Sequence, residues 1–238
     1  MTVIADQLQS VSARIAAACH AAGRDPASVR LLAVSKTFGP EAVRQAYAAG
    51  QTAFGENYIQ EAVDKMAALA DLPLQWHCIG PIQSNKTRLV AEHFAWAQTV
   101  DRLKIAQRLH EQRPPHLAPL QVCLQVNVDG GATKSGVAPQ EALALARAVA
   151  TLPRLQLRGL MCIPDPQPDC ETMKAVFLRA KALYEQLRAA GLPLDTLSMG
   201  MSSDLEAAIH AGSTMVRVGT AIFGGRDYGP ASAPTPTP

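Results

Sequence analysis

Eight short apolar segments, each followed by a stretch with helical spacing, constrain the fold of this chain more than any other feature of its sequence. Short apolar runs bounded by turn residues are typical of strands buried on both faces, and parallel strands need long crossover connections. One further helix is expected at 3–22, ahead of the first strand. The strand-like segments lie at 31–36, 52–54, 74–79, 93–100, 120–128, 155–161, 196–199 and 214–218.

This count predicts an α/β protein, a single (β/α)8 TIM barrel with an extra N-terminal helix. A doubly wound open sheet is the alternative. A closed barrel makes the first and last strands neighbours, so that segments from both ends of the chain surround one site. We expect the barrel to occupy residues 1–228 and a disordered tail to follow at 229–238, because that segment is rich in Pro, Ser and Thr.

Composition excludes several classes of protein. The net charge of the 238 residues is +2 and the charges of both signs are scattered, which argues against nucleic acid as a partner. No apolar run is long enough to span a membrane, and no basic leader precedes an apolar segment, so we expect a cytoplasmic protein. The five cysteines lack the spacing of metal ligands, which predicts reduced thiols and no metal site.

Lys36, at the end of the first strand, is the first candidate functional residue. An ammonium group is expensive to remove from water without a partner. One interpretation is a lysine that extends to the rim of the barrel and has no function. The other is a desolvated, neutral amine that attacks a carbonyl group and forms a Schiff base.

Polar residues also follow other strands at the end where barrel enzymes place their active sites. Asn57 follows the second strand, and Ser202 and Ser203 stand between the seventh strand and a helix. Backbone N–H groups at a helix start favour anions, although an ordinary serine N-cap is the alternative. Arg217 and the pair 219–220 (Gly219 and Thr220) belong to the eighth strand and its end. An amine facing a phosphate site suits a phosphorylated aldehyde.

Six blocks of sequence resemble the YggS/PROSC-type pyridoxal phosphate homeostasis proteins, over about residues 4 to 228. The resemblance implies a barrel similar to the N-terminal domain of alanine racemase, holding pyridoxal 5′-phosphate (PLP) as a Schiff base on Lys36. The blocks are AVSK (33–36), FGENYIQEA (54–62), WHCIGPIQSNKTR (76–88), KSG (134–136), LRGLM (157–161) and LSMGMSSDLEAAIHAGSTMVRVGTAIFG (197–224).

The resemblance also implies roles for the remaining candidates. Arg217 would face the pyridine nitrogen and Asn57 would lie beside the ring. A permanent cation at that nitrogen keeps it unprotonated and makes the cofactor a weak electron sink. The phosphate would lie among the other four candidates, Ser202, Ser203, Gly219 and Thr220. The loop 129–134 lacks the acidic residues that relatives usually carry near Gly131 and Ala132, so no regulatory role is carried over to it.

Whether such a protein is an enzyme depends on a second base, because racemisation needs one on each face of the substrate carbon. Alanine racemase takes its opposing tyrosine from a second domain, whereas this sequence ends shortly after the eighth strand and offers only His77. We therefore expect a non-catalytic, monomeric PLP-binding homeostasis protein, with PLP-dependent apoenzymes as the partners that the family implies. A weak PLP-dependent amino-acid racemase and a class-I aldolase-like barrel that uses Lys36 on a phosphorylated sugar remain alternatives.

Overall fold

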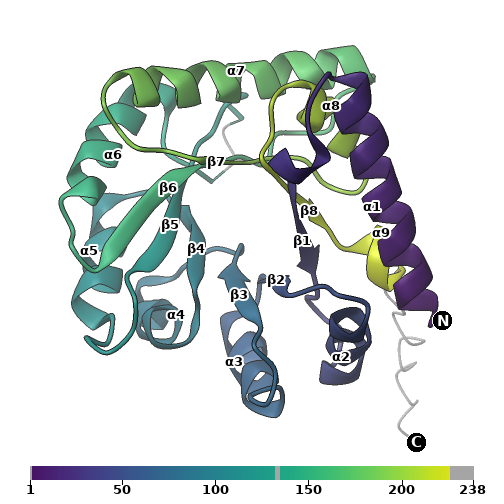
Figure 1. Ribbon diagram of the computed structural model, residues 1–238. Helices are drawn as coiled ribbons and strands as arrows, with labels where there is room; N and C mark the ends of the chain where they lie inside the picture. Colours follow the sequence, from purple (N-terminus) through teal and green to yellow (C-terminus); the bar gives the residue numbers. More distant parts are fainter. Residues whose placement is uncertain (1, 132–134, 226–238) are drawn as a thin grey trace, which may run out of the picture.

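The computed structural model describes residues 2–131 and 135–225. The expected tail at 229–238, the barrel boundary at 228 and Lys134 lie outside these described residues. Within them, eight parallel strands close into a barrel in sequence order, and the last strand pairs with the first through Arg30 and Met215 (Figure 1). The barrel prediction is confirmed, and the open doubly wound sheet is wrong.

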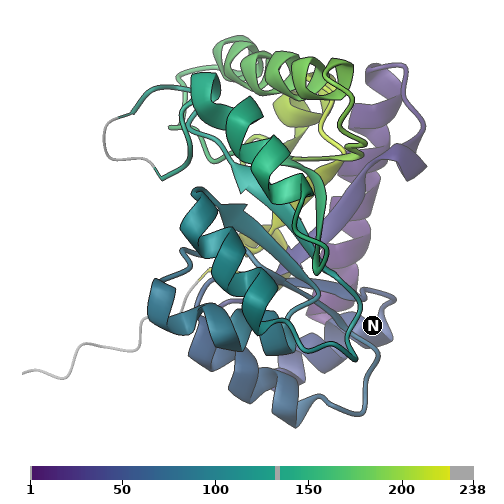
Figure 2. The ribbon, with the colours of Figure 1, turned by 90° about the vertical axis from the view of Figure 1, so that its left-hand side faces the viewer.

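The barrel strands alternate with helices that cover their outer face (Figures 1 and 2). The strands are β1 (Arg30–Val34), β2 (Ala53–Glu56), β3 (Gln75–Cys78), β4 (Trp96–Val100), β5 (Leu120–Gln125), β6 (Leu155–Met161), β7 (Thr196–Ser198) and β8 (Met215–Val218). The α-helices are α1 (Val3–Ala21), α2 (Pro40–Ala48), α3 (Ile59–Ala68), α4 (Thr87–His93), α5 (Leu103–Gln112), α6 (Ala142–Ala150), α7 (Cys170–Ala189), α8 (Leu205–His210) and α9 (Thr220–Phe223). Short 3-10 turns occur at Pro26–Ser28, Ser84–Lys86 and Pro139–Glu141.

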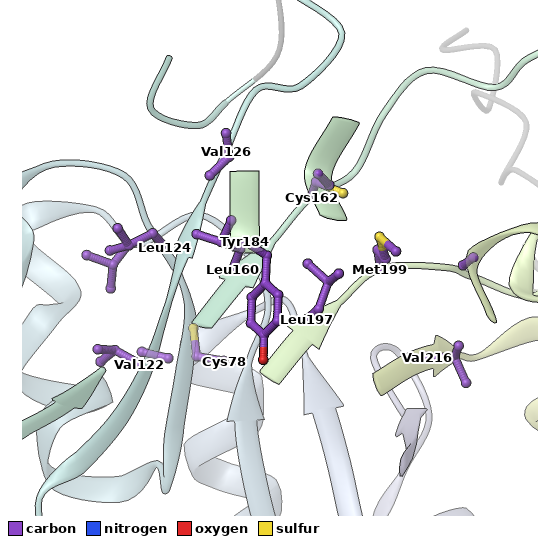
Figure 3. Packing of buried hydrophobic residues seen from close by; sticks show 14 of the residues in the cluster. Cys78, Val122, Leu124, Val126, Leu160, Cys162, Tyr184, Leu197, Met199 and Val216 are labelled. Atoms are coloured by element: carbon purple, nitrogen blue, oxygen red, sulfur yellow. The ribbon is translucent and has the colours of Figure 1, made fainter. Parts of the chain in front are cut away.

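Apolar residues at helical spacing face the barrel, as the sequence pattern predicts. The helix α1 buries Leu8, Val11 and Ile15, and it packs beside α8 and α9 (Figure 1). In α7 the ring of Tyr184 lies beside Leu160 and Leu197 of the barrel wall (Figure 3). One continuous apolar layer between strands and helices therefore fixes the barrel on which the site is built.

Several element boundaries differ from the expectation. The fourth strand begins at Trp96 rather than at 93, because His93 still belongs to α4. The fifth strand ends at Gln125 rather than at 128, since the side chain of Asn127 bonds the N–H of Gly130 and turns the chain. Pairing beyond Gln125 is a single bridge from Val126 to Val137. The helix α9 was not expected, because four residues carry too little periodicity to predict it.

The expectations from composition concern the thiols, metal ligands and long helices. The five cysteines are free, and Cys170 is the exposed one. Among the described residues, no three His, Cys, Asp or Glu side chains gather into a possible metal site. In the same part of the chain, no helix combines the length and apolarity that crossing a membrane requires.

Candidate functional site

A cavity of about 650 Å³, here called the mouth cavity, opens where the strands of the barrel end. It is lined by residues of β1, β8 and α9 and by the loops that follow β1, β2, β3, β6, β7 and β8. The structure brings together every residue that the sequence nominates for ligand binding: Lys36, Asn57, Ser202, Ser203, Arg217, Gly219 and Thr220. Their role in binding a particular ligand stays a prediction.

Lys36 stands in a tight turn that follows β1. The N–H of Phe38 donates to the carbonyl of Ser35 at 3.1 Å, which makes Lys36 and Thr37 the two central residues of this turn. Thr37 has a φ of 69°, the left-handed conformation that type II turns require at this position. Phe38 then stacks on Phe223 of α9, with 5.2 Å between ring centroids. The turn therefore ties the start of the barrel to its end, and Lys36 faces the mouth cavity.

Asn57 is held against the loop that follows β3. A Cβ atom on Gly80 would lie 2.2 Å from the carbonyl oxygen of Asn57, so only glycine allows this approach. The side-chain Oδ1 of Asn57 is buried and has no hydrogen-bond partner in the structure. Such orphaned acceptors are rare in folded proteins. An acceptor of this kind beside the mouth cavity fits a ligand that donates a hydrogen bond.

Arg217 places a buried guanidinium on the floor of the mouth cavity, with 4% of the residue exposed. Its Nη1 donates to Ser198 Oγ at 2.8 Å and its Nη2 donates to the carbonyl of Cys162 at 2.9 Å. Among the described residues, no carboxylate forms an ion pair with it. Burial lowers the pKa of Arg217, although a guanidinium remains cationic at any ordinary pH. Arg217 is therefore an interior side chain and not a surface arginine.

Behind Arg217, a chain of hydrogen bonds continues into the barrel. Ser198 Oγ donates to Gln98 Oε1 at 2.7 Å, and Gln98 Nε2 donates to His77 Nδ1 at 2.9 Å. His77 Nε2 then donates to Gln75 Oε1 at 3.1 Å. Gln98 and Ser198 are not among the residues that the sequence nominates. Gln98 lies within β4 and Ser198 is the last residue of β7.

His77 lies inside this chain and does not suit the role of a second base. It is fully buried, and its ring stacks on Trp96 at 5.0 Å rather than on the neighbouring Trp76. Burial, together with the positive charge of Arg30, holds the pKa of His77 well below its usual value. Both ring nitrogens already have partners within the barrel. The side chain is therefore a neutral part of the interior.

The turns after β7 and β8 form the other side of the mouth cavity. Gly200 has a φ of 99° and packs so tightly on α8 that a Cβ atom would lie 2.5 Å from the Cβ of Ala208. Asp204 Oδ1 accepts from the N–H of Met201 at 2.5 Å and closes the turn that carries both serines. Asp204 is also the N-cap residue of α8, so the interpretation of Ser202 and Ser203 as N-caps is wrong.

Backbone donors converge at these two turns. No backbone hydrogen bond within the described residues is donated by the N–H groups of Ser202, Ser203 or Gly219. Gly219 is the N-cap residue of α9, and Thr220 is the first residue of that helix. Free N–H groups and hydroxyls in such turns suit an anion.

The fold and the mouth cavity define a barrel of the alanine racemase class, with a lysine after the first strand and turns with free backbone N–H groups after the last two. The family model of the alanine racemase N-terminal domain matches residues 7–227. The pyridoxal phosphate homeostasis protein of Pseudomonas aeruginosa is 63% identical over 233 residues, which is 98% of this chain and 100% of that relative. The chain belongs to the family of pyridoxal phosphate homeostasis proteins.

Solved structures agree with this assignment. PipY of Synechococcus elongatus, solved with PLP bound, superposes with a TM-score of 0.82 at 40% sequence identity, over 93% of this chain and 100% of that one. Alanine racemase of Corynebacterium glutamicum superposes with a TM-score of 0.68 at 17% identity, over 93% of this chain and 60% of that enzyme. The second likeness concerns the fold alone.

Proposed function

We propose that this chain binds PLP in the mouth cavity, holds it as a Schiff base on Lys36, and thereby takes part in PLP homeostasis. The observation that carries the proposal is the convergence of an amine, a buried cation and free backbone donors on one cavity. The cavity volume lies within the range of small-molecule sites, about 300–1,000 Å³. The name of the relatives and the PLP bound to PipY support the same ligand.

The residues of the mouth cavity fit the functional groups of PLP. Ser202, Ser203, Gly219 and Thr220 would hold the phosphate, since their backbone and hydroxyl donors suit an anion. The orphaned Oδ1 of Asn57 would accept a hydrogen bond from the ligand. PLP, when bound, supplies an aldehyde that reacts with amines and a ring that withdraws electrons.

Arg217 supports binding rather than catalysis. Its charge is permanent, so it favours an unprotonated pyridine nitrogen, and the electron-withdrawing power of the ring is then small. His77, the other candidate base, is neutral and already bonded to Gln75 and Gln98. We therefore propose a non-catalytic, monomeric PLP carrier that supplies PLP-dependent apoenzymes. A cytoplasmic location is part of the proposal, supported by five free thiols.

Borohydride reduction of the purified, PLP-loaded protein, followed by mass mapping, tests the proposal. We expect a phosphopyridoxyl adduct on Lys36 and a near-visible absorption band that reduction removes. Lys36→Ala should abolish both and still bind phosphate at the turns after β7 and β8. Lys104→Ala, which replaces an exposed lysine of α5, is the control and should behave as the parent protein.

Two outcomes would contradict the proposal. An adduct on Lys86 or another lysine, with Lys36 unmodified, would overturn the assignment of the site. Incubation with single amino-acid enantiomers in deuterated water tests the racemase alternative, because lysine-dependent exchange of the α-hydrogen with inversion would make the protein an enzyme.

A further inference from the structure

Two charged side chains of α3 bind the backbone on both sides of Lys36, and a third, from β2, binds the side chain of Ser35. The ammonium of Lys65 donates to the carbonyl of Ser35 at 2.9 Å. The N–H of Thr37 donates to Glu61 Oε1 at 2.8 Å. Side chains of α3 therefore bind the residue before Lys36 and the residue after it.

The three side chains, here called the Glu56–Lys65–Glu61 cluster, also bind one another. Lys65 Nζ lies 2.7 Å from Glu56 Oε1 and 3.2 Å from Glu61 Oε1. With Ser35 as its third acceptor, the ammonium uses all three of its N–H groups. Ser35 Oγ donates to Glu56 Oε1 at 2.6 Å, which adds a second contact to the residue before Lys36. Because each of these donors has an acceptor, the cluster fixes the positions of its side chains as well as pairing their charges.

The turn that the cluster holds contains a strained residue and borders two cavities. A left-handed conformation costs a non-glycine residue about 1–2 kcal/mol, and Thr37 adopts it with a φ of 69°. A second cavity, of about 330 Å³, also borders the turn, and its lining includes Thr37, Phe38, Glu61 and Lys65. Thr37 and Phe38 line the mouth cavity as well. Because Thr37 and Phe38 border both cavities, hydrogen bonds contribute much of what holds the backbone of the turn in place.

We propose that Glu61 and Lys65 are positioning residues, which fix the backbone around Lys36 so that its amine reaches the aldehyde of a ligand in the mouth cavity. This inference rests on the proposed function of Lys36. Glu61 contributes through the N–H of Thr37, and Lys65 contributes through the carbonyl of Ser35. Neither side chain lines the mouth cavity, so both act through the turn and not by touching the ligand.

Substitutions of Glu61 provide the sharper test, because its side chain is 37% exposed and the protein is expected to fold without it. Glu61→Ala removes the acceptor of the Thr37 N–H, whereas Glu61→Gln keeps an oxygen at that place. Glu92→Ala is the matched control, because Glu92 is also a helical glutamate that pairs with a cation four residues away. Two probes are used: PLP, and pyridoxine 5′-phosphate, which carries an alcohol in place of the aldehyde.

We expect Glu61→Ala to weaken the apparent affinity for PLP about tenfold, the equivalent of one hydrogen bond to a charged group. Its affinity for pyridoxine 5′-phosphate should stay within about twofold of the parent value, since that probe forms no bond to Lys36. Glu61→Gln should recover most of the PLP affinity, and Glu92→Ala should leave both affinities unchanged.

The inference is overturned if Glu61→Ala binds PLP as the parent does, if it loses affinity for both probes equally, or if Glu61→Gln is as weak as Glu61→Ala. The parent protein separates this inference from the proposed function. A parent that binds PLP but forms no adduct on Lys36 overturns the proposed function, and the positioning role with it. A parent that forms the adduct leaves the proposed function standing whatever the variants do.

Discussion

Lys65 and Glu56 form an ion pair of 2.7 Å in the interior, where the exposed fractions of their side chains are 3% and 0%. Burial raises the pKa of the Glu56 carboxyl, and the contacts with Lys65 and Ser35 oppose that rise. One carboxylate oxygen, Oε2, has no hydrogen-bond partner in the structure. The two charges therefore depend on each other, because neither has water to replace its partner.

Lys65→Met should destabilise the protein by about 3 kcal/mol or more, since it leaves the buried carboxylate of Glu56 without a counter-charge. The free energy of unfolding in urea is the measurement. The double variant Lys65→Met/Glu56→Gln removes both charges, and the amide oxygen that replaces the carboxylate would still accept from Ser35 Oγ. We expect it to recover at least half of the loss, whereas purely additive effects of the two substitutions would refute the mutual dependence.

The sequence was sufficient to predict the barrel and the candidate residues around its mouth. Eight apolar segments alternating with helices specify the topology, and the polar residues at or just after the strand ends (Lys36, Asn57 and Arg217) specify where a site can form. Periodicity carries this information because strand and helix burial repeat along the chain.

The Glu56–Lys65–Glu61 cluster could not be predicted in this way. A lysine on a helix normally indicates a solvated face, and only the folded structure shows Lys65 buried against β1 and β2. The same holds for the chain from Arg217 through Gln98 to His77, which joins residues that lie far apart in the sequence. Pairing between distant side chains depends on tertiary packing, which local patterns do not encode.

Thr37→Asn should stabilise the protein by about 0.5–1 kcal/mol, because Asn tolerates the left-handed conformation that is unfavourable for a β-branched residue. Thermal unfolding of the unliganded protein measures the effect. Thr52→Asn is the control, since Thr52 is also exposed but has no positive φ. A gain of the same size at Thr52, or none at Thr37, would show that the turn at Lys36 stores no strain.

His77 should make the stability depend on pH in the acid range. Because burial depresses its pKa, the folded protein keeps His77 neutral while the unfolded chain binds a proton below about pH 6.5. Unfolding thus takes up a proton, and the free energy of unfolding falls by up to about 1.4 kcal/mol per pH unit as the pH decreases below that value.

Urea denaturation between pH 5 and pH 8 measures this slope. In His77→Gln the free energy of unfolding should change less steeply with pH, by the contribution of one proton. His116→Gln, which replaces an exposed histidine, should keep the slope of the parent protein. If the free energy of unfolding of His77→Gln depends on pH as steeply as that of the parent, His77 is charged in the folded state. A charged His77 would donate to Gln98, which is the reverse of the hydrogen bond described above.

Arg217 and Arg113 are both buried guanidinium groups, and we expect their removal to affect mainly PLP affinity for Arg217 and mainly stability for Arg113. Arg113 is 6% exposed and donates to the carbonyls of Ala91, Phe94 and Ala118. Arg113→Met should therefore lower the free energy of unfolding by about 3 kcal/mol, through the loss of three charge-assisted hydrogen bonds, and leave the affinity for PLP unchanged. Arg217 makes two such bonds and lines the mouth cavity.

Arg217→Met should lower the free energy of unfolding of the unliganded protein by about 1–2 kcal/mol, less than Arg113→Met, because it removes two hydrogen bonds rather than three. Its affinity for PLP should fall at least tenfold, as expected for a charged group that faces the ligand. Urea denaturation measures the free energy of unfolding of both variants, and PLP titration measures their affinity for PLP. If Arg217→Met loses as much stability as Arg113→Met and binds PLP as the parent does, Arg217 is a structural arginine and the floor of the mouth cavity has no part in recognising the ring.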